Sequence, residues 1–215
     1  MKQKKYNLIL KSNYLSHFHT NYTDGHLSIE DYFSFCQKNH IDTLIFSEHV
    51  RKKMNYNFKK FCKEIKSISK KFPTIKYIIG VEAKFLPPND LDINDDILTQ
   101  VEALFFACHA FPNDENLFLN NAKNQFENKK YDHLIKIWAH PGRFFKKYPS
   151  KNENKLMIKL INIAQKNNVF IEHNKQDQLI KKKFLNYIDQ DKLIIGHDIH
   201  TQKQLENLQN NTIIL

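Results

Sequence analysis

The sequence has few of the features that mark membrane or secreted proteins. Its 215 residues contain no apolar run near the roughly 18 to 20 residues that span a bilayer, and the apolar stretch at 6–10 is too short for a signal-peptide core. Cys36, Cys62 and Cys108 lie far apart and in no metal-binding pattern, so we expect reduced thiols rather than disulfides. These absences predict a soluble, cytoplasmic protein without a membrane partner.

Arginine is also scarce. Of the 33 lysines and arginines only two, Arg51 and Arg143, are arginine, although the net charge is +10. A basic chain can neutralise nucleic-acid phosphates, but proteins that read nucleic acids usually rely on the planar fork of arginine. We therefore treat nucleic acid as a less favoured partner than a small molecule.

Glycine and proline, at four and six residues, are scattered, and no linker rich in either residue divides the chain. The content of 41% hydrophobic and 26% charged residues is ordinary for a globular protein. A chain of this length is long enough for a sizeable core but short for two full domains. The composition therefore predicts a single domain.

Short apolar segments alternate with longer amphipathic ones, which is typical of an α/β chain with parallel strands. The segments predicted as strands are 14–16, 43–47, 77–81, 103–107, 135–139, 169–172 and 193–196. The segments predicted as helices are 28–38, 58–71, 155–166, 179–188 and 202–208. The stretch 111–132 is polar and receives no assignment. Seven strands, mostly separated by helices, predict a barrel or a strongly wound sheet.

A histidine or a carboxylate follows the end of every predicted strand. Function gathers at the C-terminal ends of strands in such folds, because several loops meet there. The residues at these positions are His17, His19, Asp24, Glu48, His49, Glu82, His109, His140, Glu172, His173, His197, Asp198 and His200. One histidine after a strand is more often structural than a ligand, but scattered core histidines have no reason to recur at the same end of successive strands. The joint pattern predicts a metal site.

The spacing of these residues supports a site with more than one ion. Alternate residues of a strand point the same way, so His17 and His19 can face one metal, as can Asp198 and His200. The two oxygens of Glu82 can bridge two cations. Imidazole and carboxylate ligands together suit zinc, manganese or iron.

In this order the motifs resemble the PHP family, named for polymerase and histidinol phosphatase. The family pattern is H-x-H-T with a following D-G, then H, G-x-E, H, an H-P-G-like turn and G-x-D-x-H. This chain matches it with His17-Phe18-His19-Thr20, Asp24-Gly25, His49, Gly80-Val81-Glu82, His109, His140-Pro141-Gly142 and Gly196-His197-Asp198-Ile199-His200. The resemblance covers residues 14 to about 201. It implies a distorted seven-stranded (β/α)7 barrel, with residues 1–215 as one PHP-type metal-dependent hydrolase domain.

The resemblance further implies three divalent ions, which we expect to be zinc, manganese or iron. The ligands of the three ions would be His17, His19, Glu82 and Asp198; Glu82, His109 and His140; and Asp24, His49 and His200. Bridged cations lower the pKa of a shared water, which makes hydroxide available for in-line attack on a phosphate. The chain departs from the usual family residues at His173 and His197, where aliphatic and small residues are common.

Both arginines lie close to a predicted ligand. Arg51 is two residues after His49 and Arg143 is three residues after His140. Their guanidinium groups match the oxygens of a phosphoryl group, so Arg51 and Arg143 are predicted to bind substrate, with Lys175 as a third candidate. The candidate catalytic residues are Glu82, Asp198, His200 and Arg143.

The favoured function is hydrolysis of a small phosphomonoester, of the histidinol phosphate or sugar phosphate type. Ser47-Glu48-His49 resembles the second motif of histidinol phosphatases, and the L-P-G-x-D-D-G stretch of capsular phosphotyrosine phosphatases is absent. A second hypothesis is a nuclease acting on nucleic-acid ends, for which the basic and aromatic segment 142–148 would bind bases. A third is a non-catalytic binding module. The nine filled ligand positions argue against it.

Overall fold

The computed structural model describes residues 9, 11–175 and 179–210. Its strands form two sheets. The smaller sheet is parallel and has the order β1 (Tyr14–Ser16), β2 (Thr43–Ile45), β4 (Lys76–Ile78). The larger has the order β10 (Leu193–Gly196), β9 (Val169–Asn174), β8 (Ile135–Trp138), β7 (Ala103–Ala107), β5 (Gly80–Leu86), β3 (Glu48–His49), and β6 (Asp90–Leu91) pairs antiparallel with β5.

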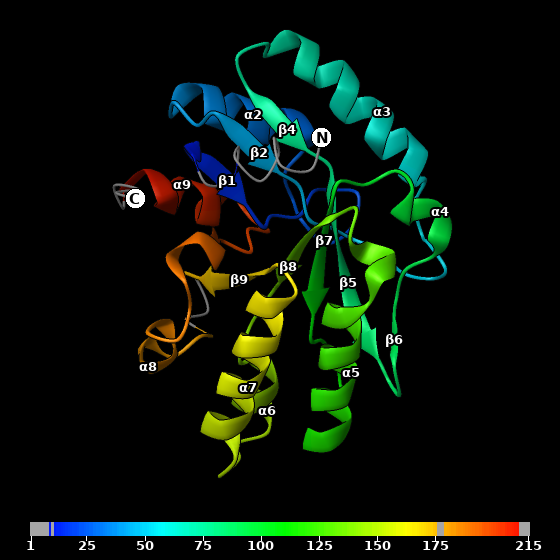
Figure 1. Ribbon diagram of the computed structural model, residues 1–215. Coiled ribbons are helices and arrows are strands. Elements are labelled where there is room, and N and C mark those ends of the chain that lie inside the picture. The colour runs from blue at the N-terminus through cyan, green and yellow to red at the C-terminus, as the bar shows by residue number, and fades with distance from the viewer. Residues whose placement is uncertain (1–8, 10, 176–178, 211–215) are drawn as a thin grey trace.

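The two sheets are joined by the chain itself and by backbone hydrogen bonds. After β2 and β4 the chain crosses into the larger sheet as β3 and β5. The end of β10 meets the end of β1, where the N–H of His197 donates to the carbonyl of Ser16 at 3.1 Å and that of His19 donates to the carbonyl of Ile199 at 2.9 Å. The strands thus wind around in chain order as a distorted barrel (Figure 1), which confirms the predicted fold class.

Alternation along the strands separates an inner from an outer apolar set. Ala103, Phe105 and Ala107 of β7 belong to a small buried cluster with residues from the other strands of the barrel, while Leu104 and Phe106 between them belong to the large cluster that includes helix residues. Successive side chains of a strand point to opposite faces. The small cluster therefore fills the interior of the barrel, and the large cluster packs the helices onto its outer surface.

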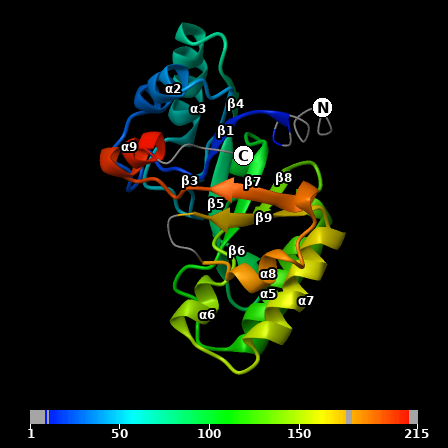
Figure 2. The same ribbon diagram turned by 90° about the vertical axis from the view of Figure 1, so that its left-hand side faces the viewer.

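The helices cover the outside of the strands. Figures 1 and 2 show α2 (Ile29–Lys38), α3 (Phe58–Ile68) and α9 (Gln202–Asn210) beside the smaller sheet, and α5 (Glu115–Glu127), α6 (Arg143–Lys147) and α7 (Glu153–Lys166) beside the larger one. Shorter helices are α4 (Asp95–Leu98), α8 (Lys182–Leu185) and the 3-10 turns Ser69–Lys71, Lys129–Tyr131 and Gln190–Lys192. Ser28 and Asp31 form a capping box that starts α2.

The structure corrects three of the predicted elements. Segment 77–81 is divided between two sheets, as β4 and the start of β5, and segment 43–47 is a strand only at 43–45, which is β2. The helix predicted over 179–188 is only the four residues of α8, because Leu179 and Ile180 are buried outside any helix. The unassigned stretch 111–132 contains α5, whose buried face includes the polar residues Asn121 and Gln125. Within the described ranges, no helix combines the length and apolar character needed to cross a membrane.

Candidate metal centre

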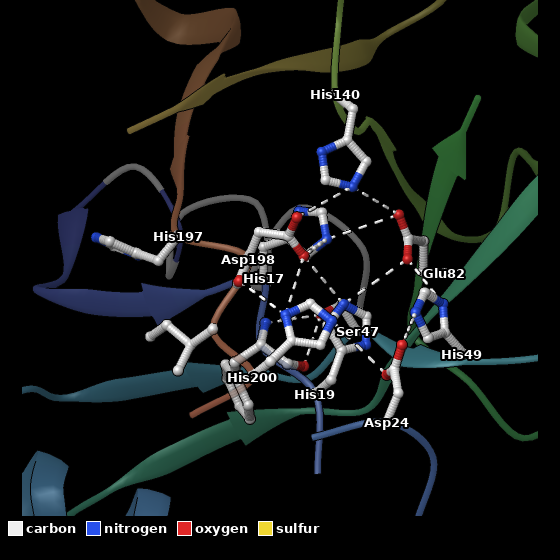
Figure 3. A network of polar contacts seen from close by, with 12 residues as sticks. His17, His19, Asp24, Ser47, His49, Glu82, His140, His197, Asp198 and His200 are labelled. Carbon is white, nitrogen blue, oxygen red and sulfur yellow. Dashed lines mark hydrogen bonds and ion pairs between the residues drawn. The ribbon is translucent and has the colours of Figure 1, made fainter. Parts of the chain in front are cut away.

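The nine side chains predicted as metal ligands lie together, and Figure 3 shows eight of them. His49 and Glu82 lie on β3 and β5, and the other seven lie in the segments that follow the strands. Three of these residues, His17, His140 and Asp198, have left-handed backbones with φ of 61°, 53° and 51°. That conformation costs an L-residue about 1–2 kcal/mol, and such strain collects at functional sites. In all three residues it occurs directly beyond or near a strand end, where the chain turns across the mouth of the barrel.

Glu82, at the end of the Gly80-Val81-Glu82 motif on β5, is the centre of the cluster. Its Oε1 lies 3.0 Å from His140 Nε2 and 3.1 Å from His109 Nε2, and its Oε2 lies 2.9 Å from His49 Nδ1. A fourth imidazole nitrogen, His17 Nε2, lies 3.6 Å from Oε1. A buried carboxylate with imidazole nitrogens around both oxygens has the arrangement expected of a bridging ligand.

Asp198 joins the two histidines of the first motif. Its Oδ1 lies 3.4 Å from His17 Nε2 and 3.3 Å from His19 Nε2, and these three residues form one group that could hold an ion. His19 Nε2 also lies 3.7 Å from Glu82 Oε2. The four residues predicted for the first ion are therefore adjacent in the fold, although they come from three distant parts of the chain.

The residues predicted for the third ion gather at the exposed rim. Asp24 Oδ2 lies 3.3 Å from His49 Nε2, and Asp24 Oδ1 lies 3.7 Å from His200 Nε2. The ring of His19 is stacked between those of His49 and His200, with centroids 4.1 and 4.5 Å away. These four residues form a second group whose ligand atoms are close enough to hold one cation.

Metal ions fit this arrangement. Several buried atoms in the cluster have close polar neighbours but form no hydrogen bond of suitable geometry, namely Nε2 of His17, His19 and His140, Nδ1 of His49 and Oε2 of Glu82. An unsatisfied buried polar atom costs roughly 1–3 kcal/mol, and here the unsatisfied atoms are imidazole and carboxylate ligands gathered around shared points. Cations bound among them would satisfy these atoms, and the donor set of nitrogen and oxygen suits zinc, manganese or iron.

The electrostatics of the cluster divide its histidines into two kinds. Burial opposes the charged form of His17 and of His49, yet the carboxylates around them raise the pKa of His17 to about 9 and that of His49 to about 10. Burial lowers the pKa of His19 to about 3 and also lowers the pKa of His140. Burial likewise opposes the charged form of Glu82, but His109 and His49 hold its pKa well below the usual range. The carboxylates therefore stay ionised and ready to bind cations.

Glu172 was predicted to follow a strand but was not among the nine predicted ligands. Glu172 is fully buried on β9, and its carboxylate is in short contact with Nδ1 of His17. Asn174 donates its side-chain N–H to Glu172 Oε1 at 3.1 Å. A carboxylate on one ring nitrogen fixes the tautomer and turns the other nitrogen toward a metal. The spacing of Glu172 and Asn174 on one face of a strand is the signal that could have found them.

A second buried acid, Glu48, supports the loop that carries Asp24. Its Oε2 accepts from the backbone N–H of Thr20 at 2.9 Å, and its carboxylate also contacts the hydroxyls of Thr20 and Thr23. Ser47 bonds both the N–H and the carbonyl of Phe18 at 2.9 Å. Ser47-Glu48 therefore ties the second strand of the barrel to the His17–Asp24 segment rather than pointing into the metal cluster.

The three predicted substrate contacts have different positions. Arg143 begins α6 after the left-handed Gly142, and its guanidinium lies 3.1 Å from His109 Nδ1 and 3.3 Å from Asp198 Oδ2. Arg51 is instead paired with Asp92, with its Nε 3.6 Å from Oδ2. Lys175 is exposed just after β9. Of the three, Arg143 is the one that the described structure places against the predicted ligands, and the roles of Arg51 and Lys175 stay predictions.

The two histidines that depart from the family pattern lie outside the cluster. His197 is buried, with Nδ1 3.3 Å from the carbonyl of Ser16, and Figure 3 shows its ring directed away from the other labelled histidines. Burial lowers the pKa of His197 to about 4, so its ring is neutral near pH 7. His173 is half-buried on β9. Neither histidine belongs to a group of residues that could hold a metal in the described part of the chain.

Solved structures share this fold. The histidinol phosphate phosphatase of Lactococcus lactis subsp. lactis Il1403, solved with zinc, L-histidinol and phosphate, superposes with a TM-score of 0.64 at 13% identity, covering 93% of this chain and 92% of that one. An amidohydrolase II superposes with a TM-score of 0.53 at 14% identity, covering 95% and 94% of the two chains. At these identities the likeness is one of fold.

Sequence comparison adds the family. The DNA polymerase/3'-5' exonuclease PolX of Bacillus subtilis (strain 168) is 24% identical over 205 residues, which are 90% of this chain and 35% of that protein. The chain thus spans about a third of the length of this curated relative. The sequence model of the PHP domain matches residues 16–176, which include seven of the nine predicted ligands. The chain therefore belongs to the PHP domain family.

Proposed function

We propose that this PHP-family chain is a metal-dependent phosphoesterase that hydrolyses a small phosphomonoester. Membership of the PHP family supports the coarser class of metal-dependent phosphoesterase. The observation that carries the proposal is the position of Arg143, whose guanidinium lies beside Asp198 and His109 at the edge of the predicted metal cluster. A phosphoryl group bound there would meet both the cluster and a guanidinium fork.

We propose three divalent ions, held by the nine predicted ligands, with residues 1–215 acting as one domain. His17, His19, Glu82 and Asp198 would hold the first ion, Glu82, His109 and His140 the second, and Asp24, His49 and His200 the third. Bound cations of this kind supply Lewis-acid stabilisation of phosphoryl oxygens and lower the pKa of a nearby water. Glu82, Asp198 and His200 would act by holding these ions, so their catalytic role follows from ligation.

Arg143 would bind the phosphoryl group directly. In the described structure its guanidinium donates to Nδ1 of His109. A neutral histidine that offers Nε2 as a ligand carries its proton on Nδ1, so metal binding and this hydrogen bond compete. The guanidinium N–H that contacts His109 would then donate to a phosphoryl oxygen instead, while the contact with Asp198 remains, and the positive charge would stabilise the transition state.

The likeness to histidinol phosphate phosphatase supports a monoester substrate, because that protein was solved with L-histidinol and phosphate. Histidinol phosphate and sugar phosphates are therefore the starting substrate types. A nuclease is the second candidate, supported by the net charge of +10 and by the relative named as an exonuclease. Two aromatic residues of 142–148, however, Phe144 and Phe145, are buried in the core, and so they are not placed to stack on bases.

Phosphate release from a panel of phosphomonoesters, with digestion of single-stranded DNA and RNA measured in parallel, tests the proposal. We expect release of phosphate from at least one monoester in added Mn²⁺, and loss of that activity with chelator and in His109→Ala. Shortening of nucleic acid without monoester turnover would replace the phosphatase by the nuclease. No turnover of either class would favour a binding module.

A further inference from the structure

We propose that a cavity beside the metal cluster binds the leaving group of the substrate and selects a small anionic one, so that the substrate is a phosphorylated hydroxy acid. This inference rests on the proposed phosphomonoesterase function and favours a third type of monoester over the two starting types. It makes such an acid a better substrate than an aminoalcohol phosphate, including histidinol phosphate, or a neutral sugar phosphate.

The cavity lies beside the predicted site. Its volume is about 130 Å³, and its lining includes His109 and Arg143, which also belong to the metal cluster and its phosphate contact. Phe111, Phe144 and Tyr148 form its apolar part. Tyr148 is held in place by a 3.0 Å hydrogen bond from its hydroxyl to the carbonyl of Phe111. A phosphoryl group at the cluster would therefore have its leaving group directed toward a wall that is already ordered.

The volume of the cavity limits the size of the group that can be enclosed within it. Sites for drug-sized ligands have roughly 300–1,000 Å³, whereas a cavity of about 150 Å³ holds a molecule as small as benzene. A cavity of about 130 Å³ therefore matches a leaving group of about six non-hydrogen atoms. A nucleoside would extend out of the cavity, while a three-carbon hydroxy acid fits within it.

The charge of the lining determines the kind of leaving group. Among the described residues, the eight that line the cavity include the cations Arg143 and Lys147 and no aspartate or glutamate. Arg143 is paired with Asp198, but Lys147 is exposed and makes no ion pair in the described part of the chain; its Nζ lies 5.1 Å from the ring centre of Tyr148. A carboxylate in the cavity would gain a cationic partner, and an ammonium group would be repelled by Arg143 and Lys147.

The helix sets the distance between the two cations. Arg143 and Lys147 are four residues apart on α6, so they lie on the same face of the helix. With a rise of 1.5 Å per residue their backbone positions differ by about 6 Å along the axis. A phosphate and a carboxylate at the two ends of a three-carbon chain have a separation of the same order. One molecule of this class can therefore reach both cations.

The test compares three small monoesters that differ in the charge of the leaving group: 3-phosphoglycerate, glycerol 3-phosphate and O-phosphoethanolamine. We expect kcat/KM to be highest for 3-phosphoglycerate, by about tenfold over glycerol 3-phosphate, and lowest for O-phosphoethanolamine. Lys147→Glu should lower kcat/KM for 3-phosphoglycerate by at least about tenfold more than for glycerol 3-phosphate, and should remove the preference for 3-phosphoglycerate over O-phosphoethanolamine.

Lys146 provides a matched control, because it is the adjacent exposed lysine on α6 but does not line the cavity. Lys146→Glu makes the same change of charge and should leave all three kcat/KM values within about twofold. Equal rates for the three esters, or equal effects of the two variants, would overturn the inference while the phosphatase stands. Hydrolysis of none of the three or of any other monoester would overturn the proposed function, and the inference with it.

Discussion

Gly196 lies directly against the carboxyl group of Glu172, and a Cβ atom on Gly196 would overlap the Cδ of Glu172. The two residues belong to the paired strands β10 and β9. Glu172 in turn contacts Nδ1 of His17, which leaves Nε2 of that histidine facing Glu82 and Asp198. The absence of a side chain at Gly196 therefore leaves room for the carboxylate that orients a predicted metal ligand.

Gly196→Ala should weaken metal binding because the added methyl group displaces the Glu172 carboxylate from His17. We expect the purified variant to contain less metal than the wild type and to have a melting temperature lower by several degrees, since the clash is in a buried strand. Elemental analysis and thermal denaturation measure both effects. Wild-type metal content together with wild-type stability would show that this close packing has no role in the site.

Glu172→Gln keeps the size of the side chain and removes its charge. Loss of the partner of a metal-bound histidine typically lowers metal affinity by about 10–100-fold, and we expect a decrease in this range for Mn²⁺ measured by calorimetry on chelator-treated protein. Glu127→Gln, at an exposed position on α5, is the matched control and should bind metal as the wild type does. Equal affinity of the two variants would mean that Glu172 is only a structural neighbour of His17.

Arg143→Ala should reduce kcat/KM for the phosphomonoester by about 10- to 100-fold, because a charge-assisted contact to the phosphoryl group is lost. Metal content should remain near that of the wild type, since arginine is not a ligand. Arg51→Ala should have a smaller effect, because Arg51 is already paired with Asp92. A large loss of metal in Arg143→Ala with unchanged kinetics of the remaining holoenzyme would assign Arg143 a structural role instead.

The stability of the metal-free protein should depend on pH with a maximum near pH 6.5. The pKa values of His17 and His49 are raised to about 9 and about 10, so their contribution is present below pH 6.5 and is lost as the pH rises through those values. The lowered pKa values of His19 and His140 act in the opposite direction, because the unfolded chain takes up protons below pH 6.5.

Metal binding should reverse the alkaline part of this profile, because a cation displaces the protons of His17 and His49. Melting temperatures of chelator-treated protein between pH 6.5 and 9.5, with and without Mn²⁺, measure the difference. We expect the metal-free value to fall with rising pH and the gain on adding Mn²⁺ to increase. A metal-free melting temperature that rises over this range would contradict the assigned protonation of the two histidines.

The positions of the ligands could be predicted from the sequence because they depend on one simple rule. The C-terminal ends of parallel strands meet at one end of a barrel, so residues such as His17, Glu82 and Asp198 converge although they are far apart in the chain. The residues that orient these ligands from behind could not be predicted in the same way. Whether Glu172 reaches His17 depends on the pairing of β9 with β10 and on the space left by Gly196.

The strand and the helix that were predicted wrongly or missed also depend on contacts between distant parts of the chain. The apolar run at 43–47 reads as one strand, but β2 ends at Ile45. The N–H of Phe46 still bonds to the carbonyl of Ile78, and the next strand, β3, begins at Glu48 and pairs with β5, so long-range contacts decide where the strand ends. Helix α5 escaped detection because two polar residues, Asn121 and Gln125, lie on its buried face. Asn121 donates to the carbonyl of Leu86 at 2.6 Å, a partner that a periodicity argument does not contain.

A titration of chelator-treated protein with Mn²⁺, in which bound metal and phosphate release from a cleaved monoester are measured in the same samples, tests the central claim most directly. The account predicts no phosphate release without metal and an increase that follows occupancy of the cluster, with less metal bound and phosphate release lost in His109→Ala. Phosphate release that persists in the metal-free protein would contradict the claim that these residues form a metal-dependent phosphoesterase centre.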